Sequence, residues 1–368
     1  MKILRFVRKN TVFCIAALAA AVTCFLVPPD RAYAAYFDWK TLSCLFLTLA
    51  VVCALRNIKF FTILARKLVA MAGNLRSLFL LLIVITFIGS MIIANDMALI
   101  TFLPLGYFAL SVAKQEKYMA YLFVLQNISA NLGGMLTPFG NPQNLYLYSY
   151  FNIPTGEFCR IMLPPFLLAV AMLVAACLPI KATRFTIDED FGEKLNGKKT
   201  ALYLALFTAS ILIVFRVIPF ALGLAVIPVI LFFVDRDALK MVDYGLLGTF
   251  FFFFIFAGNL ARLDVVHSLV SSWLEQDTLL VSILSCQCIS NVPSAILLSR
   301  FTDHYPALLM GVNIGGTGTL IASLASLITF SEFKLLHPEQ TKKYLAIFTV
   351  ANVAFLVILT VAAKLFWI

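Results

Sequence analysis

The sequence predicts an all-α polytopic membrane protein. Of its 368 residues, 62% are hydrophobic and only 12% are charged, which excludes a set of soluble domains with hydrated surfaces. Apolar runs recur along the chain, and about 20 apolar residues suffice to cross a bilayer as a helix. A membrane β-barrel requires alternating polarity, which these runs lack. The expected partners are therefore the lipid bilayer and whatever the helices enclose.

Charge-free apolar runs predict nine membrane crossings. Two further apolar stretches, 77–113 and 278–299, each carry a polar motif at the middle, and we interpret them as re-entrant hairpins. The predicted crossings are 11–27, 41–55, 118–151, 161–180, 200–215, 219–234, 244–261, 307–330 and 344–363.

The N-terminus allows two interpretations. The basic stretch "MKILRFVRKN", the apolar run that follows it and "AYA" at 32–34 resemble a signal peptide. However, 11–27 is slightly long for such a segment, and the next apolar run looks like the return span of a helical pair. We therefore favour an uncleaved first helix.

The distribution of basic residues predicts the topology. If the N-terminus is cytoplasmic and each hairpin returns to the side that it entered from, the inner segments hold 21 of the 28 Lys and Arg residues. This threading places the C-terminus outside the plasma membrane. The net charge of +10 lies between spans, so it does not indicate nucleic acid. Residues 56–74 and 262–277 are predicted to form helices on the membrane surface, inside and outside respectively.

Cysteines give no sign of a cofactor. Almost all of the eight lie inside apolar runs, without the spacing of a zinc site or a disulfide framework. The pair in "CQC" at 286–288 could bind a soft metal, although such short pairs more often serve packing.

Two parts of the chain repeat one order of elements. "FDWKTL" at 37 precedes a span, a surface helix, a hairpin centred on "AND" at 94–96 and the motif "NLGGMLT" at 131–137. "VDYGLL" at 242 precedes the same series, with "SNVP" at 290–293 and "NIGGTGT" at 313–319. We therefore predict an N-terminal half, 1–180, a cytoplasmic linker, 181–199, and a C-terminal half, 200–368, inverted in the membrane.

Inverted repeats with helices broken at matching positions are typical of secondary transporters, whose sites lie near the midplane. Glycine and proline interrupt the broken helices 118–151 and 307–330, and this frees backbone groups to face an ion or a substrate. Small residues of this kind also serve helix packing, which is the alternative. The candidate ligands are Asn95, Asp96, Asn127, Asn131, Gly133, Thr137, Asn141 and Asn144 in the first half, and Ser290, Asn291, Asn313, Gly315, Thr317, Thr319 and Ser323 in the second.

These groups suit two kinds of ligand. Neutral oxygens suit Na⁺, for which Asn95, Gly133, Asn291 and Gly315 are the candidate ligands, whereas half-helix N-termini attract anions. Asp96 is the only carboxylate between Arg76 and Lys114, so it is a candidate to carry a proton or help bind a cation. The alternatives for Asp96 are a hairpin tip that reaches water or a helix N-cap.

The motifs "ANDMALITFLP", "NLGGMLTPFGNPQN", "SNVPSAILLS" and "NIGGTGTLIASLAS" together resemble the ion transporter superfamily. They are most similar to its citrate transporter, arsenite permease and sodium/proton antiporter branch. The resemblance covers about residues 40–330. It implies a scaffold domain, a transport domain with two opposed re-entrant hairpins and two discontinuous helices, and commonly a homodimer with an elevator-like movement.

The hairpin tips depart from the related divalent anion/sodium symporters, in which Ser-Asn-Thr motifs bind sodium and carboxylate. Here the tips are Ala94-Asn95-Asp96 and Ser290-Asn291-Val292, so the asparagines are kept and the threonines are not. This leaves the coupling ion open between Na⁺ and H⁺. The first half also has only two spans before its hairpin, where the second has three, so its scaffold looks trimmed.

The sequence therefore predicts a secondary active transporter of a small anion, with a di- or tricarboxylate such as citrate as the leading class. A Na⁺/H⁺ antiporter or an efflux permease for arsenite-like oxyanions is the alternative within transport. A membrane-embedded enzyme would need a concentrated set of acids, bases or metal ligands, which the spans lack. A passive channel fits paired hairpins and breaks less well than alternating access does.

Overall fold

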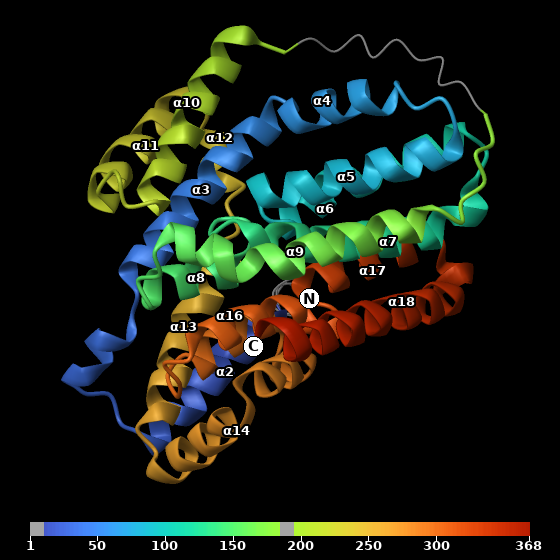
Figure 1. The fold of residues 1–368 in the computed structure, drawn as a ribbon. Helices are drawn as coiled ribbons and strands as arrows, with labels where there is room; N and C mark the ends of the chain where they lie inside the picture. Colours follow the sequence, from blue (N-terminus) through green and yellow to red (C-terminus); the bar gives the residue numbers. More distant parts are fainter. Residues whose placement is uncertain (1–10, 185–194) are drawn as a thin grey trace.

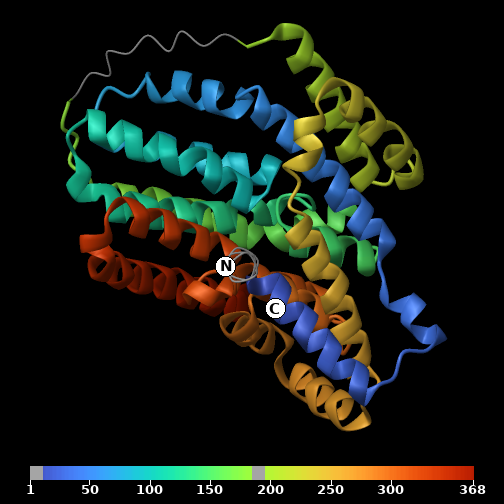
Figure 2. The same ribbon diagram turned by 180° about the vertical axis from the view of Figure 1, so that it is seen from behind.

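The computed structural model describes residues 11–184 and 195–368, which form a bundle of helices (Figures 1 and 2). This confirms the predicted all-α class. Residues 1–10 and 185–194, including five basic residues assigned to the inner side and about half of the predicted linker, lie outside the described residues. The helices before the linker are α2 (Thr11–Leu26), α3 (Trp39–Asn57), α4 (Phe60–Val69), α5 (Leu75–Ile93), α6 (Asn95–Val112), α7 (Met119–Gly133), α8 (Pro142–Tyr150) and α9 (Thr155–Cys177).

The chain after the linker continues the all-helical pattern, with no strand among its described residues. Its helices are α10 (Gly197–Val214), α11 (Phe220–Val234), α12 (Arg236–Lys240), α13 (Tyr244–Ala261), α14 (Asp264–Ile289), α15 (Asn291–Leu298), α16 (Tyr305–Ile314), α17 (Leu324–Leu336) and α18 (Thr341–Ala362).

Seven helices within 11–184 and 195–368 are long and apolar enough to cross a membrane, so the chain is a multi-pass membrane protein. Five of them coincide with predicted crossings, and α2 and α11 are shorter apolar helices. The arms of the first hairpin, α5 and α6, are the other two long helices, with 19 and 18 residues. A re-entrant path for this hairpin stays a prediction. The remaining predicted crossings, 118–151 and 307–330, are each divided into two helices.

Each hairpin reverses at one residue with a left-handed backbone. Ala94 lies between α5 and α6 with φ 67° and ψ 153°, and Ser290 lies between α14 and α15 with φ 76° and ψ 158°. Residues other than glycine rarely adopt this backbone region with positive φ. Both hairpins therefore hold a tight reversal at the same point, at a conformational cost.

Both ends of each hairpin lie together. The Phe79 ring near the start of α5 is 6.0 Å from the Tyr118 ring just after α6. At the second hairpin, Ser271 Oγ donates to the Phe301 carbonyl at 3.2 Å. The two ends of each pair of arms therefore lie at the same edge of the molecule.

Helix α14 contains a break that the sequence pattern anticipates. Asp277 has a non-helical backbone, with φ −163° and ψ 85°, and its Oδ1 accepts from the Leu280 amide at 3.0 Å. It therefore acts as the N-cap of the hairpin arm that follows. The boundary between the predicted surface helix, 262–277, and the predicted hairpin, 278–299, lies at this residue.

The helices divide into two packed groups. Helices α2, α3 and α10–α13 pack on one another, and α5–α9 and α14–α18 form a second group. Helices α3 and α13 meet α8 and α15 between the groups, and α4 packs against α3, α5 and α6. Figures 1 and 2 show α3 and α13 crossing one end of the stack formed by α5, α6, α7, α9, α17 and α18. We call the first group the crossing group and the second the stacked group.

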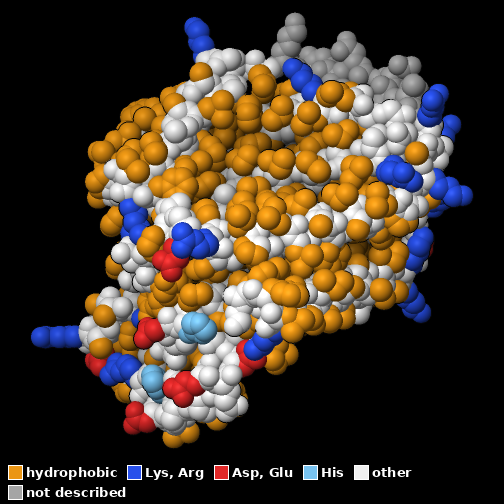
Figure 3. All heavy atoms as spheres, in the orientation of Figure 1, with side chains coloured by type: hydrophobic (Ala, Val, Ile, Leu, Met, Phe, Trp, Pro, Cys, Tyr) orange, Lys and Arg blue, Asp and Glu red, His pale blue; other side chains and the backbone are white. Residues whose placement is uncertain are grey.

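The connecting segments lie at two edges of the molecule. At one, Leu75 N donates to Thr183 O at 2.9 Å, and Lys343 Nζ donates to Lys117 O at 3.4 Å. Figure 3 shows basic side chains gathered along the right of the view, beside a wide apolar face, with most visible acidic side chains at the lower left. We call the first of these edges the basic edge; it is made by residues 66–76, 112–118, 180–184 and 334–343. We call the second the opposite edge; it is made by residues 27–40, 151–157, 215–219, 262–277 and 299–306.

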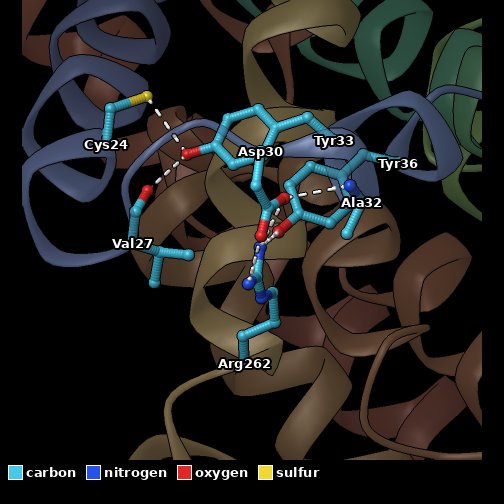
Figure 4. A network of polar contacts seen from close by, with 7 residues as sticks. All are labelled: Cys24, Val27, Asp30, Ala32, Tyr33, Tyr36 and Arg262. Atoms are coloured by element: carbon cyan, nitrogen blue, oxygen red, sulfur yellow. Dashed lines mark hydrogen bonds and ion pairs between the residues drawn. The ribbon is translucent and has the colours of Figure 1, made fainter.

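At the opposite edge, Arg262 at the end of α13 reaches the segment after α2 (Figure 4). Its Nη2 pairs with Asp30 Oδ2 at 2.7 Å, and its Nη1 donates to the Tyr36 hydroxyl at 3.1 Å. The hydrogen bond from Arg262 lowers the pKa of the Asp30 carboxyl. Deeper in the same pair of helices, Asn259 Nδ2 donates to Thr23 Oγ1 at 3.2 Å, so α2 is fixed along α13.

Each of the contacts at the two edges joins segments that the charge count assigns to one side of the membrane. The contacts therefore support the predicted threading. Which edge faces the cytoplasm stays a prediction.

Candidate functional site

The two broken helices and the two hairpin tips meet at a buried polar centre. Asn95 at the first tip donates through Nδ2 to Asn131 Oδ1 at the end of α7, at 3.3 Å. Asn313 at the end of α16 donates through Nδ2 to Asn144 Oδ1 in α8, at 2.6 Å. The tip and break residues of both halves therefore lie in one region, although they are far apart in the chain.

The two halves exchange hydrogen bonds in a reciprocal pattern. Asn141, which precedes α8, donates through Nδ2 to Asn313 Oδ1 of the other half at 3.4 Å. Ser323, which precedes α17, donates through Oγ to Asn131 Oδ1 at 2.8 Å. Asn131 and Asn313 are the first residues of the two repeated motifs. Each motif therefore accepts a bond from the residue that starts the other half's second helix.

Helix packing shows the same reciprocity. Helix α8 packs against α15 and α16 of the second half, and α17 packs against α6 and α7 of the first. This is the arrangement expected when two copies of one unit are related by an approximate two-fold axis.

The motif threonines make equivalent contacts. Thr137 Oγ1 donates to the carbonyl of Met91, three residues before Ala94, at 2.8 Å. Thr319 Oγ1 donates to the carbonyl of Gln287, three residues before Ser290, at 3.2 Å. Both threonines therefore attach the break to the first arm of its own hairpin at the same position.

The tip asparagines also match. Asn95 Oδ1 accepts from the amide of Asp96 at 2.9 Å, and Asn291 Oδ1 accepts from the amide of Val292 at 2.9 Å. Both side chains are buried, with 4% and 3% exposure. Each asparagine thus folds back onto the first turn of the arm that it begins.

Side-chain amides satisfy the carbonyls released at the breaks, but from different elements. In the first half, Asn144 Nδ2 of α8 donates to the carbonyls of Gly134, Met135 and Thr137 at 3.0–3.3 Å. The second half uses a hairpin side chain instead.

Gln287 Nε2 of α14 donates to the carbonyls of Gly315 and Thr317 at 2.9 and 3.1 Å, and its Oε1 accepts from Thr319 N at 2.8 Å. Unpaired buried carbonyls are costly, so these amides hold the non-helical segments in place.

The motif glycines allow close packing. A Cβ at Gly133 would lie 2.4 Å from the carbonyl oxygen of Phe87 and from Ser90 Oγ of α5, and one at Gly315 would lie 2.9 Å from Cys286 Sγ of α14. Ser90 and Cys286 both lie four residues before the hairpin turn. The packing alternative for these glycines therefore has direct geometric support, whereas sodium ligation by Asn95, Gly133, Asn291 and Gly315 stays a prediction.

Three buried polar atoms at the centre have no hydrogen-bond partner among the described residues: Asp96 Oδ1, Asn127 Nδ2 and Asn141 Oδ1. Asn127 Oδ1 accepts from Asn131 Nδ2 at 3.4 Å, which places it one helical turn deeper in α7. Buried groups without partners are costly, and they mark where a ligand could bind.

The remaining candidates are farther from this network. Thr317 Oγ1 turns back to the carbonyl of Ile314 at 2.6 Å, which is a local turn contact. Ser290 Oγ lies 3.4 Å from the carbonyl of Ala322, so it joins the second tip to the second break.

The sequence prediction missed Gln287, Gln126 and Thr48. Gln126, fully buried in α7, donates through Nε2 to Thr86 Oγ1 and to the Phe102 carbonyl, both at 3.1 Å, and so joins both arms of the first hairpin. An amide inside an apolar span is itself the signal that could have identified the two glutamines.

Thr48 of α3 lies across a small cavity from the first tip. The cavity, about 10 Å³ in volume, is lined by Thr48, Ala94, Phe139 and Asn141 among others. This is about the space of one water molecule. Thr48 Oγ1 and Asn141 Oδ1 are both buried with no partner in the described part of the chain, so unpaired polar groups of the crossing group and the stacked group line one gap.

Helix orientation gives the centre its electrostatic character. The arms α6 and α15 begin at the tips, and α8 and α17 begin at the breaks, so four helix N-termini converge. The side chains that precede α6, α8 and α15, namely Ala94, Asn141 and Ser290, form no capping hydrogen bond to the helix that follows. Helix N-termini carry partial positive charge. The carbonyls at the breaks after α7 and α16 already accept hydrogen bonds from the side-chain amides of Asn144 and Gln287. The converging N-termini therefore place partial positive charge at the centre.

Comparison with known proteins now decides the family. The sequence profile of the citrate transporter family, CitMHS, matches residues 3–311. The chain belongs to this family. The resemblance predicted from the four motifs is thus confirmed, and the protein is a membrane transporter and not an enzyme.

Two relatives align with most of this chain, and a third aligns with less than half of it. It is 32% identical over 335 residues to the uncharacterized transporter MJ0456 of Methanocaldococcus jannaschii, covering 90% of this chain and 91% of that one. It is 28% identical over 335 residues to the inner membrane protein YbiR of Escherichia coli, covering 88% of each. The silicon efflux transporter LSI3 of Oryza sativa subsp. japonica is 32% identical over 156 residues, 42% of this chain and 31% of that one.

Proposed function

We propose that this protein is a secondary active transporter of a small anion, with a di- or tricarboxylate such as citrate as the leading class. The reciprocal network that joins Asn131, Asn141, Asn313 and Ser323 carries this proposal, because it builds one site from both halves. Converging helix N-termini supply the attraction for carboxylates. Membership of the citrate transporter family supports the same class.

Alternating access follows from the division of the fold. The crossing group acts as the scaffold, and the stacked group moves against it in an elevator-like manner, with the hairpins re-entrant and the halves inverted. A homodimer would hold two scaffolds together. Within each chain, the two repeat halves are residues 1–180 and 200–368, joined by the linker 181–199.

Two arginines tie the moving parts at the opposite edge. Arg216 of the crossing group donates through Nη2 to the Tyr148 carbonyl of α8 at 2.6 Å. Arg300, two residues after α15, donates through Nη2 to the Tyr36 carbonyl of the crossing group at 2.6 Å. Both hydrogen bonds must break if the stacked group slides past the crossing group. They therefore stabilise the conformation seen in this structure.

Coupling would use Na⁺ or H⁺, and Asp96 is the group on which either would act. Its Oδ1 is buried at the first tip and has no partner within residues 11–184 and 195–368. A carboxylate at this depth is costly unless it binds a proton or a cation.

A second function within transport is efflux of a weak oxyacid, such as arsenite. The polar centre is built largely from neutral amides and hydroxyls, which suit a hydroxylated solute, and one relative is a silicon efflux transporter. A Na⁺/H⁺ antiporter is the other alternative, and it would use Asp96 alone.

Counterflow into proteoliposomes separates these functions. Vesicles would be loaded with citrate, succinate, sulfate or arsenite, and labelled substrate entry would be followed with Na⁺ or H⁺ gradients imposed one at a time. We expect internal citrate or succinate to accelerate entry of labelled citrate. Acceleration by arsenite with no response to either carboxylate would contradict the leading function and support the efflux alternative. A control with empty liposomes sets the background.

A further inference from the structure

A lateral groove runs between α7, α9 and α18, away from the polar centre. It is lined by Tyr121, Leu125, Ala176 and the α18 residues between Ala346 and Phe355, and its volume is about 540 Å³. This volume is within the usual range of about 300–1,000 Å³ for small-molecule sites. We call it the α18 groove.

The floor of the groove offers no unsatisfied polar group. The Tyr121 hydroxyl donates to the Ala176 carbonyl at 2.7 Å, so the polar atom nearest the basic edge is already paired. The other lining side chains are aliphatic or aromatic. An apolar occupant is therefore favoured over a polar solute.

The groove has the length of one bilayer leaflet. Ala346 and Phe355 are nine residues apart, which at 1.5 Å per residue is about 14 Å. Half of a hydrocarbon core of about 30 Å is about 15 Å. A chain that starts at the basic edge would therefore end near the bilayer centre.

Basic residues surround the groove at that edge. Lys117 lies just before α7, Lys181 lies just after α9, and Lys342 and Lys343 lie in the first turn of α18. All four are exposed, and Lys343 Nζ donates to the Lys117 carbonyl at 3.4 Å, which brings the ends of α7 and α18 together.

Among the described residues at this end, the carboxylates are fewer than the cations. Glu339 is 3.4 Å from His337, and Glu116 lies beside Lys117. The balance at the mouth of the groove is therefore positive. Figure 3 shows the basic side chains at the end of the apolar face along which α9 and α18 run.

We propose that the α18 groove binds an anionic phospholipid of the leaflet at the basic edge, with one acyl chain in the groove and the headgroup phosphate on Lys117, Lys342 and Lys343. Cationic pockets between membrane helices suit anionic headgroups, and an apolar channel one leaflet long suits an acyl chain. This site is separate from the transport site and does not depend on the transported substrate.

The test compares lipid retention by native mass spectrometry after reconstitution in equal amounts of phosphatidylglycerol and phosphatidylcholine. The wild type should retain phosphatidylglycerol in preference. Each lysine removed should lower that preference about fivefold, so Lys117→Gln/Lys342→Gln/Lys343→Gln should lose it. The matched control is Lys198→Gln/Lys199→Gln, two exposed lysines of α10 that are far from the groove in sequence and structure.

A second variant tests the acyl chain. Ala354→Phe fills the groove and should reduce retention of both lipids, whereas Val353→Phe, at an exposed neighbour that does not line the groove, should not. Size-exclusion profiles and melting temperatures identify variants that fail to fold, and Ala346→Phe then replaces Ala354→Phe.

Equal retention of the two lipids by the wild type, or unchanged retention in Ala354→Phe, would overturn the proposal. So would a dimer that Ala354→Phe dissociates without loss of lipid, because the groove would then be covered by a second copy of the chain.

Discussion

The two halves of the polar centre share one backbone plan but differ in the side chains that complete it. Both have a left-handed turn residue, Ala94 or Ser290, followed by an asparagine that folds back onto the next amide. The difference is in what secures each break. Asn144 secures the first from α8, while Gln287 secures the second from the hairpin.

The two halves also differ in the residue that follows the tip asparagine. The first tip continues with Asp96 and the second with Val292, so the centre is chemically asymmetric although its framework is repeated. We infer that the shared framework forms the substrate site, because it is built twice. The unshared carboxylate then serves coupling, for which one group is sufficient.

The strongest test of the shared framework is loss of either tip asparagine. Asn95→Ala and Asn291→Ala should each lower uptake to the level of empty liposomes while expression stays near that of the wild type. The cost to the fold is limited to about 1 kcal/mol per lost hydrogen bond. Asn352→Ala is the matched control, since Asn352 is buried in α18 and bonds only to its own helix, at the Phe348 carbonyl. Wild-type uptake in either tip variant would contradict the site.

Asp96 tests the asymmetry. Asp96→Asn keeps the size of the side chain but removes its charge and its proton, so uptake should lose its response to whichever cation gradient drives the wild type. Counterflow at equal ion concentrations on both sides should continue, because it needs no driving gradient. A wild-type response to the gradient in this variant would show that coupling lies elsewhere.

The two break amides should differ in their contribution to stability. Asn144→Leu removes a fully buried side chain that donates to three carbonyls, at about 1–3 kcal/mol for each unsatisfied group. Gln287→Leu removes a partly exposed side chain that donates to two carbonyls of the second break, so its melting temperature should fall by less. Gln340→Leu, in an exposed turn, should leave the melting temperature near the wild-type value. The comparison fails if Gln287→Leu proves the less stable of the two.

The smallest effect is expected at Asp30. Arg262 lowers the pKa of Asp30 in the folded state from its ordinary value of 3.8. A carboxyl whose pKa is lowered by folding stabilises the folded state at pH values above its pKa in the unfolded chain. This stabilisation is lost as the pH falls through the pKa of the carboxyl in the folded state. The wild type should therefore lose slightly more thermal stability than Asp30→Asn when the pH is lowered from about 6 to about 3. Identical losses would mean that the pair contributes nothing measurable in solvent.

Much of the helical framework was predictable because the bilayer limits what a sequence can do. Apolar runs between charges predicted the helices closely, and Asp277 interrupts α14 where the predicted surface helix meets the predicted hairpin. Glycine, proline and asparagine near residues 131–144 predicted a broken helix, because they release backbone groups that lipid cannot satisfy.

Site chemistry was less predictable. The sequence identified Asn131 and Asn313 as equivalent residues, but it did not show that each bonds to the other half. It also passed over Gln287 and Thr48, because one amide or hydroxyl in an apolar run gives no indication of the element that it faces.

The sequence by itself determined the helical class, the place of most long apolar helices and their two breaks, because hydrophobic length and helix-breaking residues act locally. Only the tertiary structure decided the pairing of Asn141 with Asn313 and of Ser323 with Asn131. It also decided which amide fills each break and where the lysines meet the α18 groove. Those contacts join residues that packing brings together from distant parts of the chain, and no local pattern encodes the direction of a side chain.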